Sequence, residues 1–292
     1  MNCMSLNLPF DIDERVRSRI LCFLLFVVTF FTSLSSAAAL LITPSRVVFE
    51  DRTRSEQVTL TNKGNETTTY RISFVRKKMT EHGQFVMVDE GEEGMYSDEM
   101  VRYSPRQIVL APGQSQVVRL LLRKPRGLAD GEYRSHMLMQ ALPKVTQTDI
   151  SKAVDEGGEG ISIEITTVLG ISIPVIVRNG SLDASMTFSN VRYVKSDDAE
   201  NKSYISLDMN RTGSQSTYGD FRVTHIDEAG NKVVVAIIKG VAVYTPNTLR
   251  KYQIPLGAPD GKAFDNGRFH ITYTESGKDE STGLIASVEL EL

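Results

Sequence analysis

The sequence predicts an all-β protein made of two β-sandwich domains behind an N-terminal export signal. The 292-residue chain repeats short segments rich in β-branched and aromatic residues, and polar turn signals separate these segments. Beyond the N-terminal segment, no stretch keeps the period of an amphipathic helix. Many short strands with frequent turns are typical of antiparallel sandwiches. The turn signal Asn179-Gly180 lies near the middle of the exported chain and divides the strands into two sets.

Residues 1–38 have the features of a secretory signal peptide. Arg15, Arg17 and Arg19 precede the apolar run Ile20–Phe31, and the small residues of Ser35–Ala39 follow it. A basic region, a short apolar core and small residues before a cleavage point are the three parts of such a signal. The apolar run is shorter than a membrane-spanning helix. We therefore expect cleavage near residues 37–39, export of the mature chain, and no stable membrane insertion afterwards.

Two features of this segment bear on the mature protein. Its acidic residues and its length leave two alternatives open, a translation start at Met4 or partial retention as an anchor. Both cysteines of the chain, Cys3 and Cys22, lie in it. The exported protein therefore has no thiol for a disulfide, a thiolate metal site or a cysteine nucleophile. Intact-mass measurement of the exported protein is expected to give a mass that lacks both cysteines.

The first domain is predicted over residues 39–179 and the second over residues 180–292. Predicted strands of the first are Arg46–Glu50, Ser55–Thr61, Thr69–Lys77, Gln116–Arg123 and Ile161–Arg178. Those of the second are Ser185–Val194, Ser203–Met209, Asp220–Ile226, Lys232–Val243, Arg250–Leu256, Arg268–Glu275 and Leu284–Leu292. Turns are predicted at Asn62–Asn65, Glu81–Gly83, Ala111–Gly113, Ala129–Gly131 and Asp227–Asn231.

Composition and motif searches exclude several functional classes. The formal net charge of −3 gives no basic excess for nucleic-acid binding. The four histidines lack metal-ligand spacing, and no nucleophile elbow, phosphate-binding loop or dinucleotide fingerprint occurs. The acidic run at residues 89–93 is more typical of a solvated loop than of a calcium site. We therefore expect no catalytic residue, no metal and no cofactor, and no enzymatic activity.

The most informative segment is Ile161–Arg178, which reads ISIEITTVLGISIPVIVR. Ile161, Ile163 and Ile165 fall on one face of a strand and polar residues on the other. The acidic, glycine-rich stretch Asp155–Gly160 precedes it. Two interpretations follow. The segment is an ordinary half-buried sandwich strand, or it is an edge that lends its apolar row to another chain.

Several motifs, in order, resemble those of the periplasmic pilus and fimbrial chaperones of the PapD type. Residues 42–49 (ITPSRVVF) are similar to the first strand of that family, and residues 58–62 (VTLTN) to the next. Residues 103–119 (YSPRQIVLAPGQSQVVR) resemble its P-x-x-x-x-L-x-P-G-x-x-Q-x-V-R block. Residues 130–136 (DGEYRSH), closed by 141–143 (ALP), occupy the place of its Asp-Arg-Glu-Ser stretch. The second domain resembles the family only in length and β character.

The resemblance implies two immunoglobulin-like domains set at an angle around a cleft. It also implies a function: a strand lent to incomplete pilus or fimbrial subunits, followed by delivery to an outer-membrane usher. On this basis Arg46 is the expected anchor of the subunit carboxylate. The donor strand is expected to use Ile161, Ile163, Ile165, Leu169 and Ile171.

One departure from the family concerns the anchor. Family members add a lysine late in the donor strand, but no lysine or arginine occurs between Lys152 and Arg178 here. Pro174 also lacks the N–H group of a central strand, which indicates an edge or a bulge. Arg178 is expected to have a structural role. The second possibility is that it replaces the missing lysine as an anchor of the subunit carboxylate. The sequence thus predicts a periplasmic subunit chaperone. The alternative is an exported structural or adhesive immunoglobulin-like protein without chaperone activity.

Overall fold

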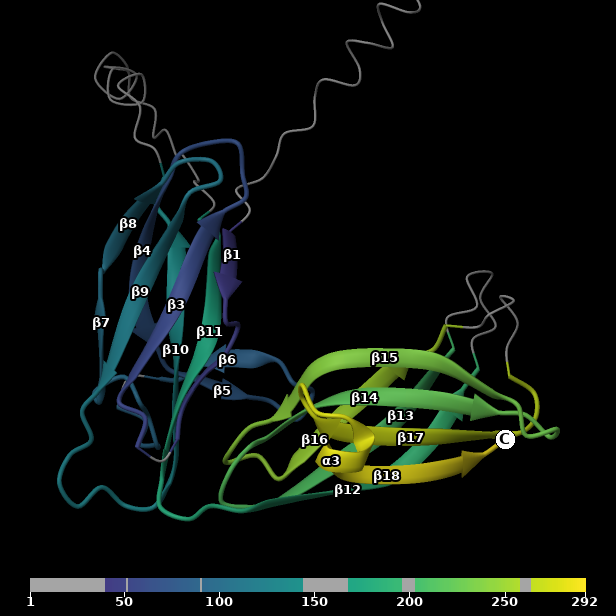
Figure 1. The fold of residues 1–292 in the computed structure, drawn as a ribbon. Helices are drawn as coiled ribbons and strands as arrows, with labels where there is room; N and C mark the ends of the chain where they lie inside the picture. Colours follow the sequence, from purple (N-terminus) through teal and green to yellow (C-terminus); the bar gives the residue numbers. More distant parts are fainter. Residues whose placement is uncertain (1–39, 51, 90, 144–167, 196–202, 258–263) are drawn as a thin grey trace, which may run out of the picture.

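The computed structural model describes residues 40–50, 52–89, 91–143, 168–195, 203–257 and 264–292. Almost all regular structure in these residues is β-strand, and two sandwiches form the two arms of an L (Figure 1). The prediction of an all-β chain with two immunoglobulin-like sandwiches is therefore confirmed. The predicted signal peptide and the isoleucines at 161, 163 and 165 lie outside the described residues.

The first sandwich consists of a four-stranded and a five-stranded sheet. The four-stranded sheet has the order β1 (Leu40–Thr43), β3 (Ser55–Asn62), β9 (Ser115–Leu122), β7 (Val101–Ser104). The five-stranded sheet has the order β2 (Val47–Phe49), β11 (Gly170–Asn179), β10 (Gly131–Ala141), β4 (Thr68–Val75), β8 (Gln107–Leu110). The chain changes sheets between β1 and β2, so β1 pairs with β3 and β2 pairs with β11.

The second sandwich is built from the strands after Gly180. One sheet has the order β12 (Ala184–Val194), β13 (Tyr204–Gly213), β16 (Leu249–Pro255). The other has the order β15 (Lys232–Val243), β14 (Thr217–Ile226), β17 (Arg268–Glu275), β18 (Leu284–Glu291). A single helical turn, α3 (Glu280–Gly283), precedes β18, and the Asp279 side chain caps it by accepting from the Thr282 N–H.

Alternation of side chains explains both cores. In β9, Val118, Leu120 and Leu122 point inward and are buried, while the residues between them are exposed. The same period places Phe221 and Val223 of β14 in the second core. The two cores are separate, and a third, smaller apolar cluster joins the domains through Met79, Val48, Ile176, Ala242, Tyr218 and Tyr244.

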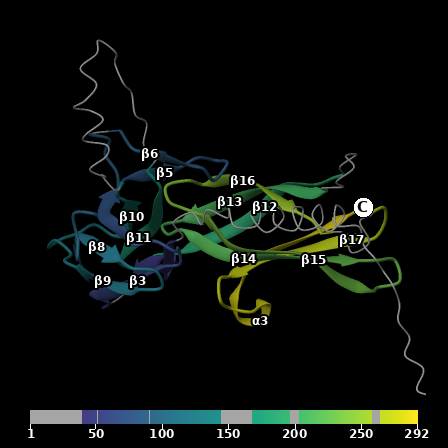
Figure 2. The same cartoon turned by 90° about the horizontal axis from the view of Figure 1, so that it is seen from above.

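The sequence does not predict the short hairpin of β5 (Lys77–Met79) and β6 (Phe85–Met87), although it predicts the turn at Glu81–Gly83. The predicted strand Thr69–Lys77 instead ends at Val75 as β4, and the hairpin leaves the sandwich. Figure 1 shows it projecting into the angle between the two arms, and the view from above in Figure 2 places it beside β16 and β10. Three-residue strands carry too little periodicity to be recognised from the sequence.

Candidate functional site

Strand β11 has an open edge over its first half. On one side it pairs with β10 along its whole length, from Gly170 opposite Gln140 to Asn179 opposite Gly131. On the other side β2 covers only Val175–Val177. Within the described sheets the edge of Gly170–Pro174 is unpaired, and an unpaired edge is a template for a strand of another chain. Pro174, which has no N–H group to donate, directly precedes Val175, the first residue of β11 that pairs with β2.

The apolar row of β11 runs from the core to this open edge. Ile173, Val175 and Val177 point into the first sandwich and are buried. The next residues of the same row, Ile171 and Leu169, are 43% and 60% exposed. These two are members of the predicted donor row, and they are the part of it that the structure describes. Large aliphatic side chains exposed beside an unpaired edge are typical of an interaction surface.

Arg46 lies between β1 and β2 at the junction of the two sandwiches. Its guanidinium carbon is 4.5 Å from the centre of the Tyr218 ring and 6.0 Å from that of Tyr244. It lines a pocket of about 440 Å³ with residues of both domains. Its Nε and Nη2 atoms are buried and have no hydrogen-bond partner. Tyrosine faces attract the cation but leave its N–H donors unused.

Arg134 brings a second guanidinium to the same junction, and the sequence analysis did not select it. It lies on β10 opposite Ile176, and its guanidinium carbon is 4.3 Å from the centre of the Tyr244 ring. Its Nε and Nη1 atoms are buried without a partner, and Nη2 donates to the Lys77 carbonyl at 3.4 Å. Burial lowers the pKa of Arg134, and the positive charge of Arg46 acts in the same direction.

A third cation approaches β11 from the hairpin. Lys77 Nζ donates to Ser172 Oγ at 2.9 Å. Ser172 belongs to the stretch of β11 that contains no lysine or arginine, so the hairpin brings a positive charge to this stretch from outside β11. A signal for Arg134 was present in the sequence, because it lies in residues 130–136, one of the motifs that the sequence analysis singled out. Lys77 and Ser172 lie far apart along the chain, so the contact between them could not be predicted from the sequence.

His136, also on β10, is buried between these groups. It is 2% exposed, both ring nitrogens lack a hydrogen-bond partner, and the Phe85 ring centre lies 4.9 Å from its own. Burial lowers the pKa of His136 to about 3, and the charges of Arg134 and Lys77 add to the effect. The imidazole therefore stays neutral at neutral and mildly acidic pH.

This neutral histidine predicts acid sensitivity. Below about pH 6.5 the unfolded chain takes up a proton that folded His136 does not bind until about pH 3. The free energy of unfolding should therefore fall as the pH drops through this window. His136→Leu should flatten the dependence, as measured by urea unfolding of both proteins at pH 7 and pH 5. An equal decrease in the two proteins would contradict this assignment.

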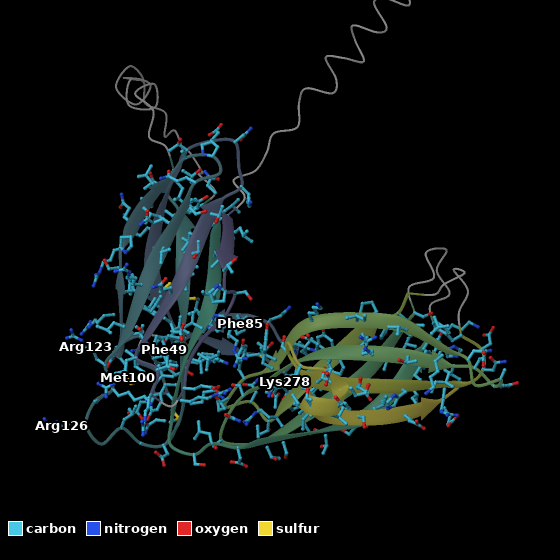
Figure 3. All side chains as sticks on the ribbon, viewed as in Figure 1. Phe49, Phe85, Met100, Arg123, Arg126 and Lys278 are labelled. Atoms are coloured by element: carbon cyan, nitrogen blue, oxygen red, sulfur yellow. The ribbon has the colours of Figure 1, made fainter. Side chains whose placement is uncertain are left out.

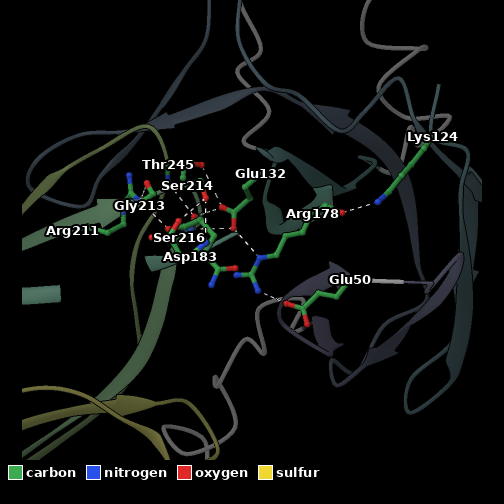
Figure 4. A network of polar contacts seen from close by, with 11 residues as sticks. Glu50, Lys124, Glu132, Arg178, Asp183, Arg211, Gly213, Ser214, Ser216 and Thr245 are labelled. Carbon is green, nitrogen blue, oxygen red and sulfur yellow. Dashed lines mark hydrogen bonds and ion pairs between the residues drawn. The ribbon is translucent and has the colours of Figure 1, made fainter. Parts of the chain in front are cut away.

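Glu132 and Arg178 fix the junction from the side of β10 and β11 (Figure 4). The Glu132 carboxylate, 0% exposed, accepts from Arg178 Nε at 3.1 Å, from Ser216 N–H at 3.1 Å and from Thr245 Oγ1 at 3.3 Å. It also accepts from the Ser216 hydroxyl, and Arg178 Nη1 donates to Glu50. Arg178 is thus held by two carboxylates, which favours its structural role over that of a substitute anchor.

The described residues contain no group of three or more histidine, cysteine, aspartate or glutamate residues that could hold a metal ion. Among the same residues, no helix has the length and apolar character needed to cross a membrane. What the junction does contain is an open strand edge, exposed aliphatic side chains and two buried guanidinium groups with unused donors. Such a site is suited to non-covalent binding of an extended apolar segment and of an anion.

Comparisons with known proteins give structural neighbours only. No family model matches the chain. No curated protein matches it either. Matching solved structures include the YadV chaperone, at 13% identity over 87% of this chain and 99% of the other, with a TM-score of 0.41. Another is the CupB2 chaperone of Pseudomonas aeruginosa, at 12% identity over 86% and 100%, with a TM-score of 0.41. A third is the CsuC–CsuE chaperone–adhesion subunit complex of Acinetobacter baumannii, at 14% identity over 79% and 93%, with a TM-score of 0.40.

Proposed function

We propose that this protein is a periplasmic chaperone that binds incomplete pilus or fimbrial subunits by lending them part of β11, and then delivers them to an outer-membrane usher. The observation that carries the proposal is the apolar row of β11. It leaves the core at Ile173 and continues as exposed Ile171 and Leu169 along an edge that no described strand covers. A subunit that lacks a strand exposes an apolar groove and unpaired backbone groups. A lent strand covers both at once.

The predicted donor residues extend this row along the sequence. Ile161, Ile163 and Ile165 share the odd numbering of Leu169 and Ile171, so in a continuous strand all five fall on one face. Burial of an aliphatic side chain of this size contributes about 1.5–3 kcal/mol. Several such side chains give a substantial binding free energy even after the cost of association. The proposed donor strand therefore runs from Ile161 to Ile171.

We further propose that Arg46 and Arg134 together bind the terminal carboxylate of the subunit. Both have buried N–H donors without partners, and the guanidinium groups converge on Tyr244. Burying an unpaired cation is costly, and a carboxylate placed between the two would remove this cost. Planar guanidinium groups suit the geometry of a carboxylate. This arrangement replaces the missing lysine of the donor strand by a residue of the neighbouring strand.

The anchor is tested with a fimbrial subunit encoded in the same gene cluster, prepared once with a free C-terminal carboxylate and once as the C-terminal amide. Arg46→Ala is expected to weaken capture of the free-carboxylate subunit by roughly ten- to a hundred-fold, because a charge-assisted hydrogen bond contributes about 1.5–3 kcal/mol. Capture of the amide should change little. Arg119→Ala, on the exposed face of β9, is the matched control.

Arg134→Met should separate anchoring from stability. Methionine keeps contact with the Tyr244 ring and removes two unpaired donors, so the free energy of unfolding should be unchanged or higher. Capture of the free-carboxylate subunit should nevertheless weaken. Equal losses for the carboxylate and amide subunits would contradict the anchor. If the wild-type protein does not capture the subunit and no usher gene accompanies its gene, the alternative of a structural or adhesive protein is favoured.

A further inference from the structure

The hairpin of β5 and β6 is a second exposed apolar element at the same junction. All three residues of β6 are apolar and exposed, with Phe85 at 42%, Val86 at 40% and Met87 at 58%. In the described sheets β6 pairs only with β5, so its other edge is open. Apolar edge strands of this kind are avoided in proteins unless something covers them.

The second sandwich holds this hairpin in place. Lys251 N–H donates to the Glu81 carbonyl at 2.7 Å, and Asn247 Nδ2 donates to the Met79 carbonyl at 2.9 Å. Gly83, at the tip with φ +78°, packs so closely on Arg250 that a side chain there would clash with the guanidinium. An element bonded to both domains keeps its exposed residues in a fixed position, which lowers the entropic cost of binding through them.

Side chains alternate along a strand, so Phe85 and Met87 of β6 point to one face and Val86 to the other. Phe85 packs on His136 and Tyr244, with ring centres 4.9 and 5.9 Å apart. The strand partner of Met87 is Lys77, whose side chain reaches Ser172 on the open half of β11. The face of Phe85 and Met87 is therefore directed toward the proposed subunit site.

Val86 belongs to the opposite face of the hairpin. It lines a pocket of about 440 Å³ with residues of the second sandwich, among them Pro246 and Leu249. Within one short strand, Met87 and Val86 thus differ in the surface they face, while both are apolar and exposed. This difference makes Val86 a matched control for Met87.

We infer that β6 is a second binding strand for the same subunit, and that Phe85 and Met87 cover an apolar flank of the subunit while β11 fills its groove. The inference rests on the proposed function, since its occupant is the subunit bound by β11. The inference is based on the continuity of β6 with the proposed subunit site. Phe85 and both arginines of the proposed anchor contact the Tyr244 ring, and Lys77 links the hairpin to the open edge of β11. A bound subunit would remove the exposed apolar surface of both strands together.

Site-specific photocrosslinking tests this inference. Benzoylphenylalanine is placed at position 87, 86 or 169 of the full chain, and each protein is mixed with the denatured fimbrial subunit of the same gene cluster during its dilution from urea. Crosslinks to the subunit are expected from positions 87 and 169 but not from 86. In parallel, Met87→Asp should weaken capture about tenfold or more while Val86→Asp changes it less than threefold, with both melting temperatures close to that of the wild-type protein.

The outcomes separate the two proposals. A crosslink from position 169 without one from 87, or equal crosslinks from 86 and 87, overturns the role of β6 and leaves the donor strand in place. No crosslink from either 87 or 169 overturns the proposed function itself.

Discussion

Ile171→Asp and Ile173→Asp are expected to have opposite effects, although the two residues are adjacent members of one row on β11. Ile171 is 43% exposed, so an aspartate there remains in water and the free energy of unfolding should change little. Ile173 is 4% exposed in the first core, and an unpaired carboxylate buried there costs several kcal/mol. Only the first variant should remain folded.

Subunit capture gives the second half of this test. Ile171→Asp should abolish capture, because the carboxylate would enter an apolar groove of the subunit without a partner. Circular dichroism melting and co-refolding with the subunit are measured on both variants. Ile171→Ser is the control for polarity without charge and should capture more weakly than wild type but better than the aspartate. A folded Ile171→Asp protein that captures subunits normally would contradict the donor role of β11.

Glu132→Ala is expected to produce the largest loss of stability among polar substitutions at the junction, about 3–5 kcal/mol. The carboxylate is fully buried and is shared by Arg178, Ser216 and Thr245, so its removal leaves donors from both domains without an acceptor. Glu132→Gln keeps the shape but loses the charge and should have an intermediate effect. Urea unfolding measures both variants.

The same substitution should loosen the junction between the two sandwiches. Ser216 and Thr245 belong to the second domain, and Glu132 is their link to β10. Small-angle scattering should therefore show a broader distribution of overall dimensions for Glu132→Ala than for wild type. Thr272→Ala, a buried polar substitution within the second sandwich, is the control and should leave the distribution unchanged. Unchanged dimensions for Glu132→Ala would contradict the linking role of Glu132.

The sequence by itself determined the β architecture, most strand positions and the apolar row that ends at Ile171. These features follow from a period of two residues, from turn signals and from the break after Asn179, all of which are local along the chain. The sequence also selected Arg46 as the candidate anchor through its motif, and it contains no lysine within β11. These inferences did not require knowledge of which strands are neighbours.

Only the tertiary structure decided how the charge at the junction is arranged. Lys77 lies far from Ser172 in sequence, and the hairpin brings the two together, while strand pairing places Arg134 opposite Ile176. The same holds for Glu132, which contacts residues 216 and 245 of the other domain. Exposure also depends on packing: Ile171 and Ile173 are identical in type and face and both precede the stretch paired with β2, but only Ile173 packs into the first core.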